Sequence, residues 1–266
     1  MELSDRHVVV TGGGSGIGRA LALRAAREGA RGVVVADLDG EKAQDVARRI
    51  GDGAFGVGCD VADDDQVGDL LARARDTFGP IDLFCANAGV AVGTDLETPD
   101  DVWDLAFAVN VRAHVLAARR LLPEWLERGE GYFLSTASAA GLLTQIGSAP
   151  YSLTKHAAVA FAEWLAITYG DRGLRVSCLC PMGVNTAMFR GGLDLPEDES
   201  LGLRTVTAAG QVLEPEDVAD AVVDGLRAER FLILPHPEVL EFFRRKGSDY
   251  DRWIAGMRRL QAQVAG

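Results

Sequence analysis

Short, wholly apolar runs that alternate with longer amphipathic segments constrain the fold of this sequence most strongly. The runs "HVVVT", "GVVVAD" and "FLIL" carry apolar residues at consecutive positions instead of at every second one. Strands of this kind are buried on both faces, as in a parallel sheet that helices cover on each side. Segments such as "GIGRALALRAAREGA" lie between the runs and carry apolar residues at helical spacing. The pattern predicts alternating strands and helices with right-handed crossovers.

The predicted elements define one architecture. We expect an α/β fold with a single-domain, doubly wound (Rossmann-type), mostly parallel seven-stranded sheet and helices on both faces. The strands are predicted at His7–Thr11, Gly32–Asp37, Ala54–Asp60, Ile81–Ala86, Gly131–Ser135, Leu174–Cys180 and Phe231–Leu234. Ligands of such sheets bind at the carboxyl ends of the strands, so functional residues are expected there.

Charge and apolar content exclude several classes of partner. The formal charge of −12 makes nucleic acid and anionic membrane surfaces poor partners. No apolar run approaches the roughly 20 residues that a membrane-spanning helix needs. The start "MELSDRHVVVTGG" leads directly into a strand and leaves no room for a signal peptide. The four cysteines form no CxxC pair and are expected to be buried, reduced thiols of a cytoplasmic protein without a metal site.

A glycine-rich turn follows the first predicted strand. In "TGGGSGIG" (Thr11–Gly18), glycines let backbone N–H groups approach a pyrophosphate, and the N-terminus of the next helix favours its negative charge. Asp37 ends the second strand, where a carboxylate can bind the ribose hydroxyls of adenosine and repel a 2′-phosphate. The alternative is that "DLDG" is only a turn in which Asp37 or Asp39 caps a helix. Since neither Ser15 nor Leu38 supplies a cation for an extra phosphate, we predict NAD as the cofactor.

Two further strand ends carry candidate cofactor residues. Asp60 follows the third strand, where it either meets the adenine edge or belongs to the helix N-terminus in "DVADDDQV"; the residues alone leave both open. "ANAG" (Ala86–Gly89) ends the fourth strand, where a glycine-containing turn keeps the adjacent cofactor ribose uncrowded. Both positions belong to the sheet edge where the glycine-rich turn is expected.

Tyr151 and Lys155 lie four residues apart in "YSLTK", within an otherwise apolar helix, and are therefore neighbours on one helix face. A free tyrosine has a pKa of about 10 and is a poor base at neutral pH. One unit charge at about 4 Å, with an effective dielectric constant near 20, is worth about 4 kcal/mol, or about three pKa units. The Lys155 ammonium and an oxidised nicotinamide ring are thus expected to lower the pKa of Tyr151 into the range of a general base.

Two polar residues near this pair have two interpretations each. Ser138 follows the fifth strand in "LSTASAAG" and either hydrogen-bonds the substrate oxygen or is an ordinary serine after a strand, with Ser135, Thr136 and Ser148 as nearby alternatives. Asn110 lies inside the apolar stretch "FAVNVRAHV" and is either a buried structural amide or the holder of a water that links the lysine to solvent. The residues alone favour the structural interpretation of Asn110.

Several of these motifs occur together in one known family. "TGGGSGIG", "CDV", "ANAG", "VNV", Ser138 with "YSLTK", and "CPMGVNT" resemble the short-chain dehydrogenase/reductase family, in its shorter branch with a TGxxxGxG turn. The resemblance runs from about His7 to Thr186 and favours functional roles for Ser138, Asn110 and Asp60. It implies a catalytic group of Asn110, Ser138, Tyr151 and Lys155. Together, the motifs give these predicted cofactor contacts: Gly12, Ser15, Gly16, Ile17, Gly18, Asp37, Leu38, Asp60, Val61, Asn87, Ala88, Gly89, Tyr151, Lys155, Pro181, Gly183, Val184 and Thr186.

The sequence departs from the family pattern at two positions. The usual Asn-Asn-Ala-Gly begins with Ala86 here, which removes a polar side chain that steadies the central strand. The usual Pro-Gly is interrupted by Met182 between Pro181 and Gly183. We expect the Met182 side chain close to the nicotinamide, where it either shapes the substrate pocket or shifts the loop.

The helix that carries "YSLTK" is apolar on all sides. Leu153, Ala157, Phe161 and Trp164 lie opposite the Tyr–Lys face. Such a helix must be covered on both sides. One side can pack on the sheet, and a second subunit is the expected cover for the other. Members of the family it resembles commonly associate through this helix, so we expect a homodimer or a homotetramer.

The remaining segments are assigned to the substrate. Residues 187–213 show no clear periodicity and are predicted as a substrate lid with a hinge at Gly191-Gly192. The candidate pocket walls are Leu142, Leu143, Ile146, Met182, Met188, Phe189, Leu193 and Leu195. The few cations of this segment, Arg190 and Arg204, disfavour phosphorylated, coenzyme A or carrier-protein substrates. Residues 236–266 are predicted as a C-terminal helical extension that packs against the core or another subunit, or contributes a second lid.

The sequence therefore predicts an NAD-dependent short-chain alcohol dehydrogenase or ketone reductase, with residues 1–266 as one dinucleotide-binding and catalytic domain. Its substrate is expected to be a small, mainly apolar secondary alcohol or the corresponding ketone, with direct hydride transfer. Two alternatives remain open. One is a catalytically silent NAD-binding sensor on the same fold, and the other is an isomerase or dehydratase that oxidises its substrate transiently.

Overall fold

The computed structural model describes residues 1–191 and 201–265. Within these residues, seven strands form one sheet in the order β3-β2-β1-β4-β5-β6-β7, and all neighbouring strands are parallel. The strands are β1 (His7–Thr11), β2 (Gly32–Asp37), β3 (Ala54–Gly58), β4 (Leu83–Ala86), β5 (Gly131–Thr136), β6 (Leu174–Leu179) and β7 (Leu232–Ile233). The doubly wound, Rossmann-type sheet predicted from the sequence is therefore confirmed.

Four strands, β3, β4, β6 and β7, are shorter than the sequence pattern predicts, and in β3 and β4 side chains take over backbone hydrogen bonds at the strand end. β3 ends at Gly58, and the amide of Asp60 beyond it donates to the side chain of Gln66. β4 begins at Leu83, after Asp82, whose carboxylate accepts a hydrogen bond from the amide of His7 at 2.8 Å. β7 consists of only two residues.

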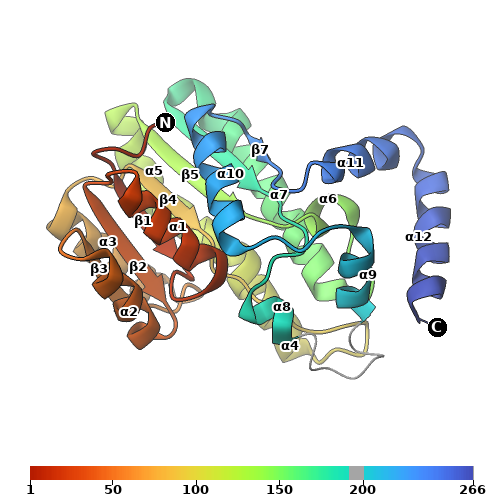
Figure 1. Cartoon of the computed structure of the whole chain (residues 1–266). Coiled ribbons are helices and arrows are strands. Elements are labelled where there is room, and N and C mark those ends of the chain that lie inside the picture. Colours follow the sequence, from red (N-terminus) through yellow and green to blue (C-terminus); the bar gives the residue numbers. More distant parts are fainter. Residues whose placement is uncertain (192–200, 266) are drawn as a thin grey trace.

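Helices cover both faces of the sheet, which explains why the strands are apolar at every position. One face packs against α1 (Gly16–Arg27), α2 (Gly40–Ile50) and α10 (Pro215–Arg227). The other packs against α3 (Asp64–Phe78), α5 (Ala113–Arg128) and α7 (Ala149–Tyr169). In β1, Val8 and Val10 belong to the first core and Val9 to the second. Figure 1 shows α1 and α10 in front of the sheet.

Most of the other helices lie around the carboxyl ends of the strands or beyond β7, and one short turn joins α7 to the start of β6. Together they are α4 (Asp100–Phe107), the π-helical turn η1 (Ala108–Arg112), α6 (Ala140–Leu143), the 3₁₀ turn η2 (Gly170–Arg172), α8 (Ala187–Gly191), α9 (Leu201–Ala209), α11 (Glu238–Ser248) and α12 (Tyr250–Ala265). α4 continues through η1 directly into α5. Among the described residues, no helix is both long enough and apolar enough to cross a membrane.

The segment between Thr186 and Glu214 is more regular than its sequence pattern suggests. It contains α8 and α9, although no helical periodicity is visible in it. Both helices are short, so neither can show a sustained apolar face. The candidate hinge residue Gly192 and the candidate lining residues Leu193 and Leu195 lie outside the described residues.

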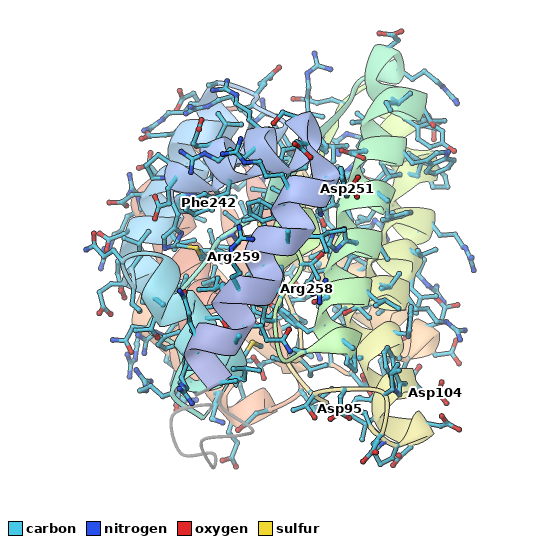
Figure 2. All side chains as sticks on the ribbon, turned by 90° about the vertical axis from the view of Figure 1, so that its right-hand side faces the viewer. Asp95, Asp104, Phe242, Asp251, Arg258 and Arg259 are labelled. Atoms are coloured by element: carbon cyan, nitrogen blue, oxygen red, sulfur yellow. The ribbon has the colours of Figure 1, made fainter. Side chains whose placement is uncertain are left out.

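The C-terminal extension forms two helices. Phe242 of α11 and Trp253 of α12 pack against the core, whereas Phe243 and Ile254 are exposed. In Figure 1, α12 stands at the right edge of the molecule, and it contacts α9. Figure 2 looks directly onto α12, which carries Arg258 and Arg259. The expected packing of this extension against the core is therefore seen for part of its apolar residues.

Candidate active site

The glycine-rich turn between β1 and α1 depends on the absence of side chains. A Cβ atom at Gly18 would lie 2.1 Å from the carbonyl oxygen of Gly12, which no residue other than glycine can accommodate. Gly12 itself adopts a positive φ of 62°. Ser15 is the N-cap of α1, and its side chain makes no capping hydrogen bond. The N-terminus of α1 thus presents backbone N–H groups and a serine hydroxyl that an anion can bind.

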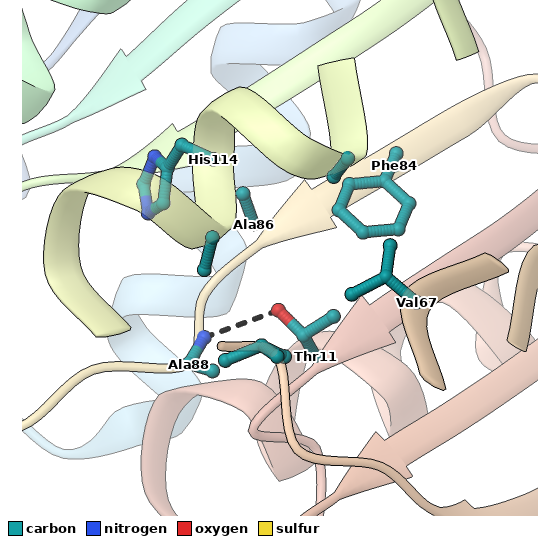
Figure 3. Close-up of a pocket in the computed structure, with 9 residues that line it drawn as sticks. Thr11, Val67, Phe84, Ala86, Ala88 and His114 are labelled. Carbon is teal, nitrogen blue, oxygen red and sulfur yellow. Dashed lines mark hydrogen bonds between the residues drawn. The ribbon is translucent and has the colours of Figure 1, made fainter. Parts of the chain in front are cut away.

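The "ANAG" turn is held tightly against this glycine turn. The hydroxyl of Thr11 accepts hydrogen bonds from the amides of Asn87 at 3.0 Å and Ala88 at 3.2 Å, the second of which is drawn in Figure 3. The side-chain amide of Asn87 donates to the carbonyl of Thr11 at 2.9 Å. Asn87 therefore fixes the two turns to each other, and its expected contact with the cofactor remains a prediction.

Asp37 lies at the carboxyl end of β2 and faces the glycine turn. Its carboxylate accepts hydrogen bonds from the amides of Gly14 at 2.9 Å and Asp39 at 3.1 Å. Asp39, not Asp37, caps α2, since its side chain accepts from the amides of Glu41 and Lys42. The neighbouring Leu38 is 78% exposed. The helix-capping alternative therefore applies to Asp39, and Asp37 is left in the position expected for a ribose-binding carboxylate.

Asp60 is not the cap of the following helix either. Its carboxylate accepts from the amide of Ala62 at 2.9 Å, whereas α3 is capped by Asp63. Val61 next to it is buried and lines a small pocket that also contacts Ala88. The stretch around Asp60 is thus fixed beside the "ANAG" turn, as the cofactor prediction requires.

The Tyr–Lys pair lies on the face of α7 that packs on the sheet. The Nζ atom of Lys155 lies 5.6 Å from the centroid of the Tyr151 ring and donates to the carbonyl oxygen of Thr136 at 3.0 Å. Lys155 is buried, and burial lowers its pKa to about 8. Gly89 makes room for this ammonium group, because a Cβ there would lie 3.3 Å from Nζ.

Ser138 lies in the loop between β5 and α6, next to the phenol of Tyr151. Its hydroxyl accepts from the amide of Ala140 at 3.1 Å and is 3.4 Å from the carbonyl of Pro181. Burial raises the pKa of Tyr151 above its ordinary value, while a hydrogen bond with Ser138 opposes the rise. The Lys155 ammonium, which donates to the carbonyl of Thr136, does not by itself offset the cost of burying a phenolate. The expected lowering of this pKa by Lys155 together with an oxidised nicotinamide ring stays a prediction.

Asn110 is fully buried in the π-helical turn η1, and its side chain is completely engaged. Its Oδ1 atom accepts from the amide of Val90 at 2.9 Å, and its Nδ2 atom donates to the carbonyl of Val90 at 2.9 Å and to the hydroxyl of Thr154 at 3.1 Å. The side chain thus joins the loop after β4 to α7, which supports the structural interpretation. Its role in holding a water remains a prediction.

Met182 begins a turn that leads away from β6 toward α1. Thr186 lies against Gly16 at the N-terminus of α1, where a Cβ would be 3.0 Å from the Thr186 methyl carbon. The side chain of Met182 reaches Gly210, since a Cβ at that glycine would lie 2.5 Å from the terminal methyl group of Met182. The Met182 side chain thus packs against the segment after α9. The two expectations for Met182, that it shapes the substrate pocket or that it shifts the loop, both stay predictions.

A small pocket lies where the family pattern has an asparagine and this chain has Ala86 (Figure 3). It is lined by Thr11, Val61, Val67, Phe84, Ala86, Ala88, Ala113, His114 and Ala117. His114 is buried in its wall; its Nδ1 atom is 3.1 Å from the hydroxyl of Ser135. Burial lowers the pKa of His114 to about 3, so this side chain is neutral. The Nε2 atom has no hydrogen-bond partner among the described residues.

Three residues near the site, His114, His236 and Lys246, were not singled out from the sequence, and Thr136 was named only as an alternative to Ser138. Thr136 holds Lys155 through its backbone carbonyl, and His114 supports the neighbouring Ser135. Lys246 and His236 come from the C-terminal part of the chain and reach the segments after β5 and β6. Rarity is the only available signal, because the chain contains just three lysines and four histidines.

The site fits a dinucleotide from one end to the other. The free N-terminus of α1 can bind a pyrophosphate, and Asp37 on one side of it can bind a ribose. Tyr151, Ser138 and Lys155 come together at the same edge of the sheet, at the ends of β5 and β6. The buried hydroxyl of Thr136 has no hydrogen-bond partner among the described residues. The fold and the site define a dinucleotide-dependent oxidoreductase.

Comparison with known proteins identifies the family. The chain belongs to the short chain dehydrogenase family, whose family model matches residues 6–193. It is 38% identical over 263 residues to 1-deoxy-11-beta-hydroxypentalenate dehydrogenase from Streptomyces exfoliatus, covering 96% of this chain and 92% of that protein. It is 33% identical over 227 residues to 2-(R)-hydroxypropyl-CoM dehydrogenase from Xanthobacter autotrophicus, covering 82% of this chain and 90% of that protein.

A solved structure agrees with this assignment. A short chain dehydrogenase/reductase from Burkholderia phymatum, crystallised in complex with NAD, superimposes with a TM-score of 0.85 at 31% identity. The alignment covers 94% of this chain and 96% of that chain. The fold and the family predicted from the sequence are both confirmed.

Proposed function

We propose that this protein is an NAD-dependent oxidoreductase that interconverts a mainly apolar secondary alcohol and its ketone by direct hydride transfer. The observation that carries the proposal is the meeting of Ser138, Tyr151 and Lys155 at the sheet edge that also holds the glycine turn. A protein that only binds a dinucleotide has no need of a buried lysine beside a buried phenol. When bound, the nicotinamide accepts or supplies the hydride and carries a positive charge in its oxidised form.

Each of the four proposed catalytic residues has a separate task. Ser138 orients the substrate oxygen, and Tyr151 exchanges a proton with that oxygen. The raised pKa of Tyr151 keeps the phenol protonated at neutral pH, which suits proton donation to a ketone. Lys155, whose pKa is about 8, provides positive charge near the phenol and holds the nicotinamide ribose. Asn110 keeps α7 and the loop after β4 in place.

The cofactor preference rests on Asp37. A carboxylate at the end of β2 accepts hydrogen bonds from ribose hydroxyls and repels a 2′-phosphate. Neither Ser15 nor Leu38 can hold that phosphate with a positive charge. The Burkholderia structure in complex with NAD supports the same preference. We extend the proposal to the other predicted cofactor contacts, from Gly12 in the first turn to Thr186 after β6.

The substrate class is proposed from the walls of the site. Leu142, Leu143 and Ile146 are buried near Ser138, and Phe189 and Val206 lie within 4 Å of the position of a Cβ at Gly183. These side chains favour an apolar substrate. The Streptomyces and Xanthobacter relatives are both named as dehydrogenases of hydroxylated substrates, which supports the alcohol–ketone chemistry. We assign residues 187–213 as the lid and residues 236–266 as a helical extension of the same domain.

The assembly is proposed from the outer face of α7. Leu153 and Trp164 are half-exposed, and Ile167 is 84% exposed. Leu105 and Phe107 of α4 are exposed as well, and α4 contacts α7. An apolar face of this kind favours association with a second copy of the chain, as a homodimer or a homotetramer. Four free, buried cysteines support a reducing, cytoplasmic location.

A panel of secondary alcohols tests this proposal. Hydrophobic secondary alcohols should produce NADH with NAD⁺ and react much more slowly with NADP⁺. Tyr151→Phe should lower kcat by about 10³-fold, because the hydroxyl that exchanges the proton with the substrate oxygen is removed, while the variant still binds NAD⁺ through its other contacts. NAD⁺ binding without turnover of any alcohol or ketone would favour the silent sensor. Conversion of a substrate without net NADH formation would favour the isomerase. An unchanged rate in Tyr151→Phe would contradict the mechanism.

A further inference from the structure

His236 is buried at a point where three segments of the chain meet. It lies in "PHP", between β7 and α11, and is 2% exposed. The second segment is the loop after β6, residues 181–186, which we call the β6 loop. The third is the stretch that leads from α9 to α10, residues 210–214, which we call the return arm. The imidazole ring is hydrogen-bonded to both.

The partners of His236 determine its tautomer. The amide of Met182 donates to Nδ1 at 3.1 Å, so Nδ1 carries no proton. Nε2 lies 3.1 Å from the carbonyl oxygen of Gly183 and 3.1 Å from that of Gln211. Carbonyl oxygens only accept hydrogen bonds, so Nε2 carries the proton and shares it between them. Each ring nitrogen of His236 is therefore committed to the backbone.

The two segments that His236 joins are also paired with each other. The amide of Leu213 donates to the carbonyl of Gly183 at 2.9 Å, and the amide of Asn185 donates to the carbonyl of Leu213 at 2.8 Å. Val184 and Leu213 form a parallel bridge. Beyond it, Thr186 contacts Gly16 at the N-terminus of α1. The β6 loop is thus fixed at one end by α1 and at the other by His236.

Met182 makes this anchoring necessary. Its side chain packs over Gly210 in the return arm, at a position where a Cβ would be 2.5 Å from its methyl group. The backbone amide of the same residue points to His236. Through the Met182 amide, the imidazole orients the residue whose side chain covers Gly210. Through the carbonyl of Gly183, it also holds the next residue of the β6 loop.

We propose that His236 is a positioning residue for the nicotinamide end of the cofactor, which acts by holding Met182 and Gly183 of the β6 loop against the return arm. The inference rests on the proposed function, in which the β6 loop contacts the nicotinamide. The imidazole touches neither cofactor nor substrate. Its effect is transmitted through the backbone of the loop and ends at the nicotinamide, far from the adenosine site at Asp37.

Two ligands separate this effect from a general structural one. NAD⁺ engages the whole site, whereas ADP-ribose lacks the nicotinamide ring. In His236→Ala, the Kd for NAD⁺ should rise by about tenfold, because a buried amide and two carbonyls lose their partner. The Kd for ADP-ribose should stay within about twofold of the wild-type value. Isothermal titration calorimetry on the full chain measures both.

Three further variants act as controls. His236→Asn retains an acceptor near the Met182 amide and should recover part of the affinity for NAD⁺. Gly210→Ala should displace Met182 while keeping the imidazole, and should reproduce the selective loss even if His236→Ala fails to fold. His156→Ala removes another histidine, whose Nδ1 atom contacts only the carbonyl of Ser152 within α7 in the described residues. That variant should bind both ligands normally.

The outcomes distinguish the inference from the proposed function. If His236→Ala and Gly210→Ala weakened the binding of NAD⁺ and of ADP-ribose equally, or weakened neither, the role of His236 would be overturned and the proposed function would stand. If the wild-type protein bound neither NAD⁺ nor ADP-ribose, the proposed function and the inference would both be overturned.

Discussion

The two halves of the sheet build their parts of the site by different means. In the nucleotide half, residues 7–128, much of the site is backbone brought into close approach, as in the contact between Gly18 and Gly12, although Asn87 and Asn110 also hold neighbouring turns there. In the catalytic half, which begins at Gly131, single side chains reach across the chain to hold carbonyl and amide groups. Lys155 holds Thr136, His236 holds Met182, and Lys246 donates to the carbonyl of Leu142 at 2.7 Å from 104 residues away.

This difference has a consequence for how each half responds to change. The nucleotide half is sensitive to added atoms, because its turns leave no space for them. The catalytic half is sensitive to removed atoms, because one side chain often supports a whole segment. Three predictions test this contrast, in order of decreasing effect.

The largest effect is expected from an added methyl group in the glycine turn. Gly18→Ala would place Cβ 2.1 Å from the carbonyl of Gly12, and should lower the free energy of unfolding by about 3 kcal/mol and abolish NAD⁺ binding. Gly53→Ala is the matched control, since a Cβ there meets no described atom within 4 Å. Urea denaturation and calorimetry measure both quantities. If the two variants were equally stable, the nucleotide half would not be sensitive to added atoms as we expect.

A smaller effect is expected from pH, through His114. Its pKa is about 3 in the fold, against an ordinary value of 6.5, so the unfolded chain binds a proton that the folded chain does not. Stability is therefore fully present above pH 6.5 and falls as the pH drops toward 3. Between pH 7 and pH 5 the loss from this residue should be about 2 kcal/mol.

His114→Gln should remove this contribution, because glutamine does not titrate. The comparison uses urea denaturation of both proteins at pH 7 and pH 5. His7, whose pKa burial also lowers, is common to both proteins and cancels in the difference. If the two proteins lost the same stability between these pH values, the assignment to His114 would be wrong.

The smallest effect is expected from Lys246, in the catalytic half. Lys246→Met keeps the length of the side chain but removes the hydrogen bond to Leu142, and should cost about 1 kcal/mol of stability. The KM for the alcohol should rise several-fold as α6 loses its support, while the KM for NAD⁺ should not change. Lys42→Met is the control, because its ion pair with Asp39 is exposed to solvent and contributes little to stability. Equal effects of both variants would contradict the supporting role of Lys246.

The features that could be predicted from the sequence are those that residues close together in the chain determine. The apolar runs predict all seven strands, since helices cover both faces of the sheet and bury most of the strand residues. The glycine turn and Asp37 are predicted for the same reason: a strand end and the next helix determine their positions. The Tyr–Lys pair follows from helical spacing alone, and the structure places both residues beside Ser138.

The features that could not be predicted depend on the balance between burial and nearby charge, on helices too short to show a pattern, or on contacts between residues far apart in the sequence. Burial raises the pKa of Tyr151, and the extent of that burial cannot be read from the distance between two residues in a helix. The helices α8 and α9 are too short to show a periodic face. His236 lies 54 residues from its partner Met182, and no local pattern connects them.

The π-helical turn η1 has a final consequence for the length of this part of the chain. Its widened ring places Asn110 so that one amide meets both Val90 and Thr154, while α4 and α5 continue on either side. Deleting one residue between Ala108 and Arg112 would close the widened ring into a regular α-helix and remove the position from which Asn110 reaches these two partners. The number of residues in this turn therefore matters as much as their identity, because the connection between the loop after β4 and α7 depends on it.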